Sequence, residues 1–151
     1  MPMRTFLVRH GDYENGPNGG KLTDTGVAQS IDAGNELAGE ELGDSIYIIS
    51  SCSGRAVQTA NHIARVLNIA EVVPSAETTI NHPNRDRGTE INRLLCGVLR
   101  RHDVPCNQID TIIAITHEPV IEEALQQMGL SESGHAIPPG SITEYLRYGK
   151  V

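Results

Sequence analysis

The stretch Leu7-Val8-Arg9-His10-Gly11 places an arginine and a histidine at the end of a short apolar run that begins at Phe6. Such a run predicts a buried strand, and the glycine lets the chain turn sharply where the strand ends. In α/β folds, ligands commonly bind where a strand meets a loop. Arginine offers a planar set of N–H donors that suits a phosphoryl group, and histidine can act as a nucleophile or a base.

Two later segments repeat this arrangement. The apolar run Ile46-Tyr47-Ile48-Ile49 is followed by polar residues and then by Arg55, and the run Ile112-Ile113-Ala114-Ile115 is followed by Thr116 and His117. Each segment is typical of a strand, a polar turn and the start of a helix.

The carboxyl ends of parallel strands lie along one edge of a sheet, so the polar residues after these three strands should meet there. Two arginines and two histidines around one point predict a pocket for a doubly charged anion. The residues expected to converge are Arg9, His10, Arg55 and His117.

The ordered set of motifs resembles the histidine phosphatase superfamily, also called phosphoglycerate mutase-like. Leu22-Thr23-Asp24-Thr25-Gly26-Val27-Ala28-Gln29 is similar to the family's signature at the start of its first helix, and the segment from Ser50 to Ala60 is similar to its second signature. The resemblance implies an α/β fold, a three-layer sandwich with a mostly parallel central sheet flanked by helices. It also implies a single domain over residues 1–151.

The resemblance implies a role for each residue at the strand ends. His10 would be the nucleophile and would carry a phosphohistidine intermediate. Arg9 and Arg55 would bind the phosphoryl oxygens, and His117 would donate a hydrogen bond that strengthens in the transition state. We expect no metal and no cofactor, because the protein itself supplies the positive charge.

The loop after His10 departs from the family pattern. Tyr13 and Gly16 stand where the mutase-like branch often has Thr and Asn. One phosphate-contacting group is then either absent or replaced by Asn15. We expect Gly11 and Asn15 to contact the substrate.

A general acid that protonates the leaving oxygen is the residue hardest to place. In the family it is a Glu after the third strand, which Glu77 matches, or an acidic residue directly after the second histidine, which Glu118 matches although Asp is more typical there. Glu118 could equally be a first-turn carboxylate that interacts with a helix dipole. Glu14, near the catalytic loop, is a third candidate.

Apolar periodicity and turn residues predict the remaining elements. Residues 15–20 and 78–87 are expected to be irregular loops. The expected helices are 25–38, 53–67, 91–99 and one between Pro119 and Gly129. The expected further strands are 45–49, 71–73, 111–115 and an edge strand at 142–148.

Composition limits the classes of partner. The formal net charge of −7 argues against nucleic-acid binding. No apolar run approaches the roughly 20 residues that span a bilayer, and the first residues lead directly into a strand rather than forming a secretory signal. We expect a soluble, cytoplasmic protein without membrane partners. Three cysteines, Cys52, Cys96 and Cys106, lack paired metal spacing and are expected to be reduced thiols, with reactivity of Cys52 left open.

These observations favour a phosphatase that acts on a phosphorylated small molecule or on a phosphohistidine-bearing protein. The short chain lacks the insertions that form a lid in mutases and acid phosphatases, and so resembles the small bacterial phosphohistidine phosphatases. The alternatives are a phosphoglycerate mutase-type phosphotransferase, which needs an enclosed site, and a non-catalytic module that binds a phosphorylated partner.

Overall fold

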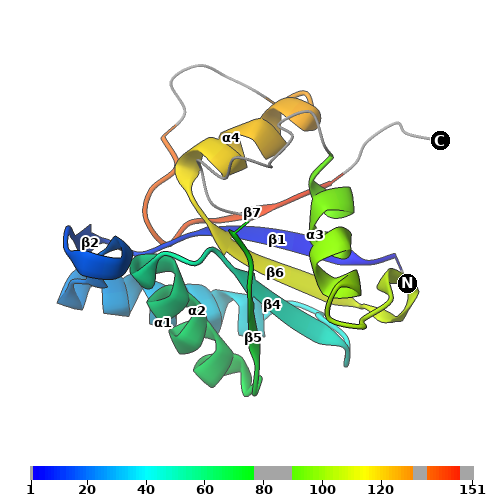
Figure 1. The fold of residues 1–151 in the computed structure, drawn as a ribbon, viewed down its shortest axis with the longest axis horizontal. Helices are drawn as coiled ribbons and strands as arrows, with labels where there is room; N and C mark the ends of the chain where they lie inside the picture. Colours follow the sequence, from blue (N-terminus) through cyan, green and yellow to red (C-terminus); the bar gives the residue numbers. More distant parts are fainter. Residues whose placement is uncertain (1, 77–89, 131–135, 147–151) are drawn as a thin grey trace.

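The computed structural model describes residues 2–76, 90–130 and 136–146. A central sheet carries helices on both faces (Figure 1). Its strands are β1 (Arg4–Arg9), β4 (Ile46–Ser50), β5 (Val72–Pro74), β6 (Thr111–Thr116) and β7 (Ile142–Glu144). The α-helices of the described part are α1 (Asp24–Ala38), α2 (Gly54–Leu67), α3 (Ile91–Arg100) and α4 (Glu118–Gln127).

The central sheet is mostly parallel, as expected. Its strand order is β5-β4-β6-β1-β7, and only β7 runs antiparallel, against β1. The register pairs Arg9 with Thr116 across β1 and β6, and Ser50 with Ile115 across β4 and β6. The carboxyl ends of these three strands therefore finish level with one another at one edge of the sheet.

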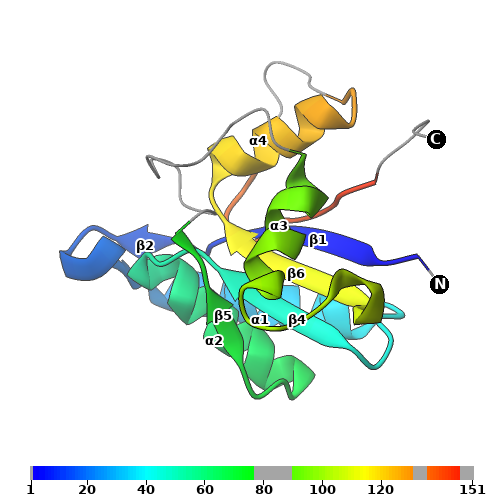
Figure 2. The ribbon, with the colours of Figure 1, turned by 45° about the vertical axis from the view of Figure 1, so that its right-hand side comes forward.

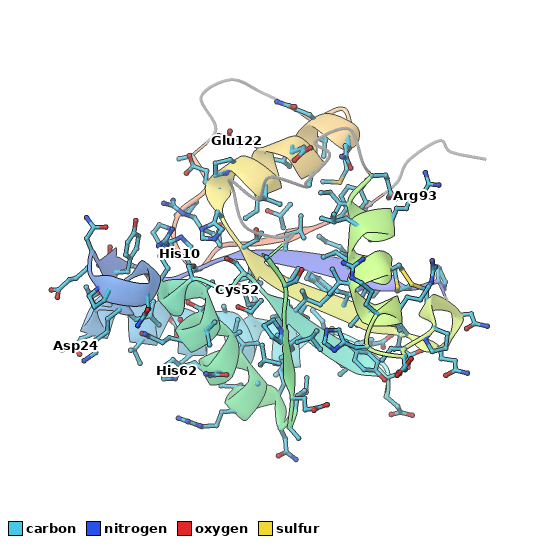
Figure 3. The ribbon with its side chains drawn as sticks, viewed as in Figure 1. His10, Asp24, Cys52, His62, Arg93 and Glu122 are labelled. Atoms are coloured by element: carbon cyan, nitrogen blue, oxygen red, sulfur yellow. A yellow bond between two sulfur atoms is a disulfide. The ribbon has the colours of Figure 1, made fainter. Side chains whose placement is uncertain are left out.

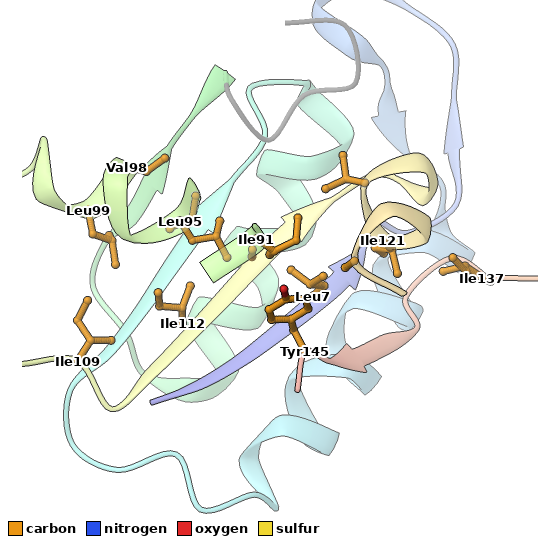
Figure 4. Close-up of a cluster of buried hydrophobic side chains, with 14 residues drawn as sticks. Leu7, Ile91, Leu95, Val98, Leu99, Ile109, Ile112, Ile121, Ile137 and Tyr145 are labelled. Carbon is orange, nitrogen blue, oxygen red and sulfur yellow. The ribbon is translucent and has the colours of Figure 1, made fainter. Parts of the chain in front are cut away.

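Alternate residues of the strands face opposite helical layers. Ile113 and Ile115 of β6 pack in a core with α1 and α2, whereas Ile112 and Ala114 pack in a core with α3 and α4. Figure 2 shows the two layers from a second direction, and Figure 4 shows the α3 and α4 core, with Leu7 and Ile112 among its side chains. All six residues of β6 are buried, which explains why the strand reads as an unbroken apolar run.

The helices and strands confirm most of the expected elements, including the edge position of the last strand. Residues 15–20 are more regular than expected, because they hold a 3-10 turn, η1 (Pro17–Gly19), between two short strands. These strands, β2 (Tyr13–Glu14) and β3 (Lys21–Leu22), pair antiparallel as a small ribbon. The composition of the loop hid this pairing, because two-residue strands have no periodicity to detect. The loop expected at 78–87 lies outside the described residues, as do the last residues of the strand expected at 142–148.

The expectation of three reduced thiols is wrong for two of them. Cys96 of α3 and Cys106 of the 3-10 turn η3 (Cys106–Gln108) form a disulfide, and Cys52 is a free, exposed thiol. The return of the chain after α3 brings the two Cα atoms to 5.8 Å, a proximity that sequence spacing does not reveal. Reduced thiols were one reason to expect a cytoplasmic location, and that reason is removed. Separately, within the described ranges, no helix is long and apolar enough to cross a membrane.

The loop after β1 is held against the first turn of α1 by two glycines. A Cβ on Gly11 would lie 2.5 Å from the carbonyl oxygen of Gly26, and a Cβ on Gly26 would overlap the carbonyl oxygen of Asp12. Thr23 caps α1 by accepting the N–H of Gly26 at 3.0 Å. Both Gly11 and Gly26 therefore stand where backbone packs directly on backbone.

We predict that Gly26→Ala lowers the free energy of unfolding by about 1–3 kcal/mol, because the added methyl meets backbone that no side-chain rotation can move. Gly39→Ala is the matched control, since Gly39 has φ −80° and its added Cβ would lie 3.4 Å from the nearest oxygen. Urea denaturation of both variants measures the difference. Equal losses in the two variants would show that the contact between Gly26 and the backbone of Asp12 is not tight in solution.

Candidate active site

His10 lies at the end of β1 with only 4% of its surface exposed. Its Nδ1 is 3.0 Å from the carbonyl oxygen of Gly11. A carbonyl can only accept, so Nδ1 carries the proton and Nε2 keeps its lone pair. That lone pair accepts the Nε–H of Arg55 at 3.2 Å. Nε2 of His10 is thus unprotonated and lies next to a fixed cation.

Arg55 reaches this position from the first turn of α2. Its Nη1 donates to the carbonyl oxygen of Gly19 at 2.7 Å, and its guanidinium lies over the ring of Tyr13 at 4.5 Å. The start of α2 packs closely on the η1 turn, because a Cβ on Gly54 would lie 2.6 Å from the carbonyl oxygen of Gly20. The backbone contact therefore fixes the position of the Arg55 backbone, and the contacts with Gly19 and Tyr13 fix the position of its guanidinium.

His117 follows β6 and is 2% exposed. Its ring lies 5.1 Å from that of His10, and its Nε2 is 2.8 Å from Oγ of Ser51. Within the described part of the chain, its buried Nδ1 has no hydrogen-bond partner. A buried polar atom without a partner is costly, so this nitrogen suits a polar group of a ligand.

Arg9 is turned so that one edge of its guanidinium is used by the protein. Its Nη1 donates to the carbonyl oxygen of Ile137 and to Oε2 of Glu118, the latter at 3.2 Å. Among the described residues, its buried Nε has no partner. The Nε edge is the one that can offer two parallel N–H bonds to an oxyanion.

Both histidines are held in the neutral form. The pKa of His10 is lowered from 6.5 to about 4, mainly by burial and also by the nearby cations Arg55 and Arg9, against the raising effect of the Gly11 carbonyl. The pKa of His117 is lowered to about 3, mainly by burial, with smaller contributions from His10, Arg55 and Arg9. A neutral imidazole is the form that can attack an electrophile. The site therefore combines neutral imidazoles with cations that favour an anionic ligand.

The structure brings together Arg9, His10, Arg55 and His117, the four residues expected to converge. The amide of Gly11 is already bonded to Oγ1 of Thr59 at 3.0 Å, and so is not available for a ligand in this structure.

Of the other expected site residues, Glu118 contacts Arg9. Asn15 and Glu14 are exposed on and after β2, and Glu77 lies outside the described residues. Figure 3 places Cys52 on the same side of the molecule as His10, whereas Arg93 lies on α3 at the far side.

Sequence reasoning missed three residues that contact the expected ones: Tyr13, Ser51 and Thr59. Ser51 and Thr59 lie inside the motif that contains Arg55, so the motif itself was the signal for them. Tyr13 was visible only as a departure from the family pattern.

A cavity of about 670 Å³ lies away from these residues. It is lined by residues 44–47 and 69–74, with His102 and Val104 after α3. Shape alone would direct attention to it, but it holds neither the arginines nor the neutral histidines. No group of three or more potential metal ligands occurs within the described ranges. The convergent chemistry therefore locates the candidate site.

A family model of the histidine phosphatase superfamily, branch 1, matches residues 5–77, which include Arg9, His10 and Arg55. Over these residues, just under half of its length, the chain is similar to the histidine phosphatase superfamily. His117 lies beyond the matched residues, and the structure is what brings it to His10. A comparison with curated protein sequences finds no match.

Solved structures share the fold of this chain. The protein histidine phosphatase SixA complexed with tungstate is 22% identical, with a TM-score of 0.71 over 94% of this chain and 86% of that one. A mycobacterial glucosyl-3-phosphoglycerate phosphatase is 13% identical, with a TM-score of 0.66 over 95% and 90%. A phosphoserine phosphatase from Entamoeba histolytica is 18% identical, with a TM-score of 0.63 over 95% and 90%. At these identities the likeness shows the fold.

The lowered pKa values predict how the two histidines titrate. In NMR titrations of labelled protein, both imidazoles should stay neutral from pH 8 to about pH 5, and His10 should take up its proton only near pH 4. In the unfolded chain they titrate near 6.5, so the unfolded state binds more protons below that pH. Stability should therefore fall as pH drops from 6.5 towards 4. A His10 signal that titrates near 6.5 would contradict the buried, neutral state; His117→Asn assigns the two signals.

Proposed function

We propose that this chain is a metal-independent phosphatase that passes a phosphoryl group first to Nε2 of His10 and then to water. The observation that carries the proposal is the state of that nitrogen. Nε2 is unprotonated because Nδ1 donates to Gly11, and it lies 3.2 Å from Nε of Arg55. An anionic phosphoryl group drawn to the arginines would meet the lone pair of His10.

The proposed first step is attack by Nε2 of His10 on phosphorus as the bond to the leaving group breaks. Arg9 and Arg55 would hold the phosphoryl oxygens in line, and positioning with charge stabilisation is most of what catalysis of phosphoryl transfer requires. Nδ1 of His117 would donate a further hydrogen bond, with Ser51 bonded to Nε2 of the same ring.

In the second step, water attacks phosphorus and the P–N bond breaks. Orthophosphate is released, and His10 returns to its neutral form. The positive charge in both steps comes from protein side chains, so the scheme includes no metal.

The similar structures support an oxyanion site. SixA was solved with tungstate, and the mycobacterial phosphatase was solved with a vanadate ion. Both ions are oxyanions of the kind that occupy a phosphoryl pocket. For this chain we propose that the substrate is phosphohistidine in a protein or a small phosphomonoester.

The two substrate classes differ in how much they need a general acid. An alkoxide leaves poorly unless it is protonated, whereas a protonated imidazole is already a good leaving group. Glu118 accepts a hydrogen bond from Arg9 and is 41% exposed in its side chain. This contact favours a role in orienting Arg9 over a role as the proton donor, and leaves Glu77 as the acid candidate for an ester substrate.

We predict that rapid acid-free quenching of the enzyme with ³²P-labelled substrate traps a phosphoryl group on His10, stable in base and labile in acid. His10→Ala should abolish both adduct and turnover, and a chelator should change neither. Mass spectrometry under alkaline conditions locates the adduct. Label on a serine or cysteine, or activity that is lost with chelator and restored by a divalent ion, would contradict the proposed mechanism. Binding of phosphate without turnover of any phosphoester or phosphohistidine peptide would favour the binding-module alternative.

A second prediction separates the roles of Glu118 and Glu77. If Glu118 orients Arg9, Glu118→Gln should slow nitrophenyl phosphate and alkyl phosphates by the same factor and weaken vanadate inhibition. If Glu77 is the acid, Glu77→Gln should slow alkyl phosphates by up to ~10²–10⁴-fold while nitrophenyl phosphate is much less affected. Steady-state rates across a series of leaving groups measure both variants. A leaving-group dependence in Glu118→Gln would reverse the assignment.

A further inference from the structure

The ring of Tyr13 packs against both Arg55 and His10. The guanidinium carbon of Arg55 lies 4.5 Å from the ring centroid. The ring of His10 meets it nearly perpendicularly, at 83° and a centroid distance of 5.2 Å. Because His117 lies 5.1 Å from His10 at another angle, the nucleophilic imidazole has aromatic neighbours in Tyr13 and His117.

Gly20 makes room for this ring. It has φ +89°, and a Cβ there would lie 2.8 Å from Cδ2 of Tyr13 and 2.7 Å from the carbonyl oxygen of Glu14. Only a residue without a side chain, in the left-handed region, fits beneath the ring. The backbone at Gly20 therefore holds the ring of Tyr13 in a defined position.

The β2–β3 ribbon that carries Tyr13 is fastened to the helix that carries Arg55. Tyr13 pairs with Leu22 across the ribbon, and the N–H of Leu22 donates to Oε1 of Gln58 on α2 at 2.8 Å. From the turn of the same ribbon, Gly19 accepts the Nη1–H of Arg55 at 2.7 Å. The ring, the ribbon and the guanidinium are thus all joined to the start of α2.

We propose that Tyr13 is a positioning residue that fixes the guanidinium plane of Arg55 and the imidazole plane of His10, so that donor and nucleophile stay aligned. The proposal rests on the proposed function for its catalytic consequence, but the alignment itself is testable without turnover.

Arginine has four rotatable side-chain bonds, and the Gly19 contact restrains only one end of the guanidinium. The face of the Tyr13 ring attracts the cation and restrains its plane. The edge contact with His10 blocks the imidazole from tipping and keeps water from it. The contacts described all involve the ring rather than the phenolic oxygen. A Thr at this position could form a hydrogen bond but would offer no such surface, so the departure from the family pattern exchanges one means of ordering the site for another.

The test compares Tyr13→Leu, which removes the aromatic face, with Tyr13→Phe, which keeps it. The first measurement gives two quantities, the inhibition constant of vanadate and kcat, with nitrophenyl phosphate as the substrate. In Tyr13→Leu the inhibition constant should rise about 3- to 30-fold, the range expected for loss of a cation–π contact, and kcat should fall. Tyr13→Phe should recover most of both losses.

The second readout is the pKa of His10 by NMR, which requires no activity. Burial is the main cause that holds it at about 4, so removing the ring should raise it towards 6.5 in Tyr13→Leu and much less in Tyr13→Phe. A Tyr13→Leu protein with unchanged vanadate inhibition and an unchanged His10 titration would overturn the proposal.

Gly20→Ala gives an independent variant if Tyr13→Leu does not fold. Its methyl group would meet the ring from below and the carbonyl oxygen of Glu14, without replacing any side chain of the site, so it should shift vanadate inhibition and the His10 pKa in the same directions. A folded Gly20→Ala protein with wild-type values for both would also overturn the proposal. If no adduct forms on His10 in the trapping experiment, the proposed function fails but the proposal for Tyr13 does not. The NMR titration tests the Tyr13 proposal separately, because it reports on alignment in the resting protein.

Discussion

The site depends on the parallel register of β1, β6 and β4. Hydrogen bonding between neighbouring strands brings Arg9 level with Thr116, and Ser50 level with Ile115. The residues that follow the three strands therefore lie at the same edge of the sheet. Short turns lead from β4 into α2 and from β6 into α4. A slip of one residue in β6 would turn its apolar side chains to the opposite layers, where they would meet the wrong core. The two cores that hold the register therefore also hold the four polar residues together.

The packed site contains an electrostatic imbalance that an anion would relieve. Two guanidinium groups lie beside two histidines that burial keeps neutral, in a chain whose formal net charge is −7. Most acidic residues lie elsewhere on the surface, and Glu118 is the carboxylate that contacts Arg9. Nε of Arg9 and Nδ1 of His117 are buried without partners in the described part of the chain. A phosphoryl group would supply acceptors for both and negative charge for the arginines.

Much of this could be predicted from the sequence, because the strands are apolar runs and the polar residues follow them directly. His10, Arg55 and His117 each come within a few residues of a strand end, so the parallel-sheet rule was sufficient to bring them together. The Cys96–Cys106 disulfide and the Ser51–His117 bond could not be found in the same way. They join residues whose proximity depends on how a helix returns or how a loop curls, and neither has a periodicity. The roles of Tyr13 and Glu118 depend on side-chain orientation, which spacing alone leaves undetermined.

The resting contacts also bear on the order of events in the proposed reaction. Arg55 donates to Nε2 of His10 while its other end is held by Gly19. An anionic phosphoryl oxygen is a stronger acceptor than a neutral imidazole nitrogen, so a bound phosphoryl group would compete for the Nε–H of Arg55. The same binding event would thus stabilise the phosphoryl charge and free the lone pair that attacks it. A ligand without that charge would leave the lone pair bonded to Arg55, which makes the arginine a means of restricting the nucleophile to phosphoryl groups.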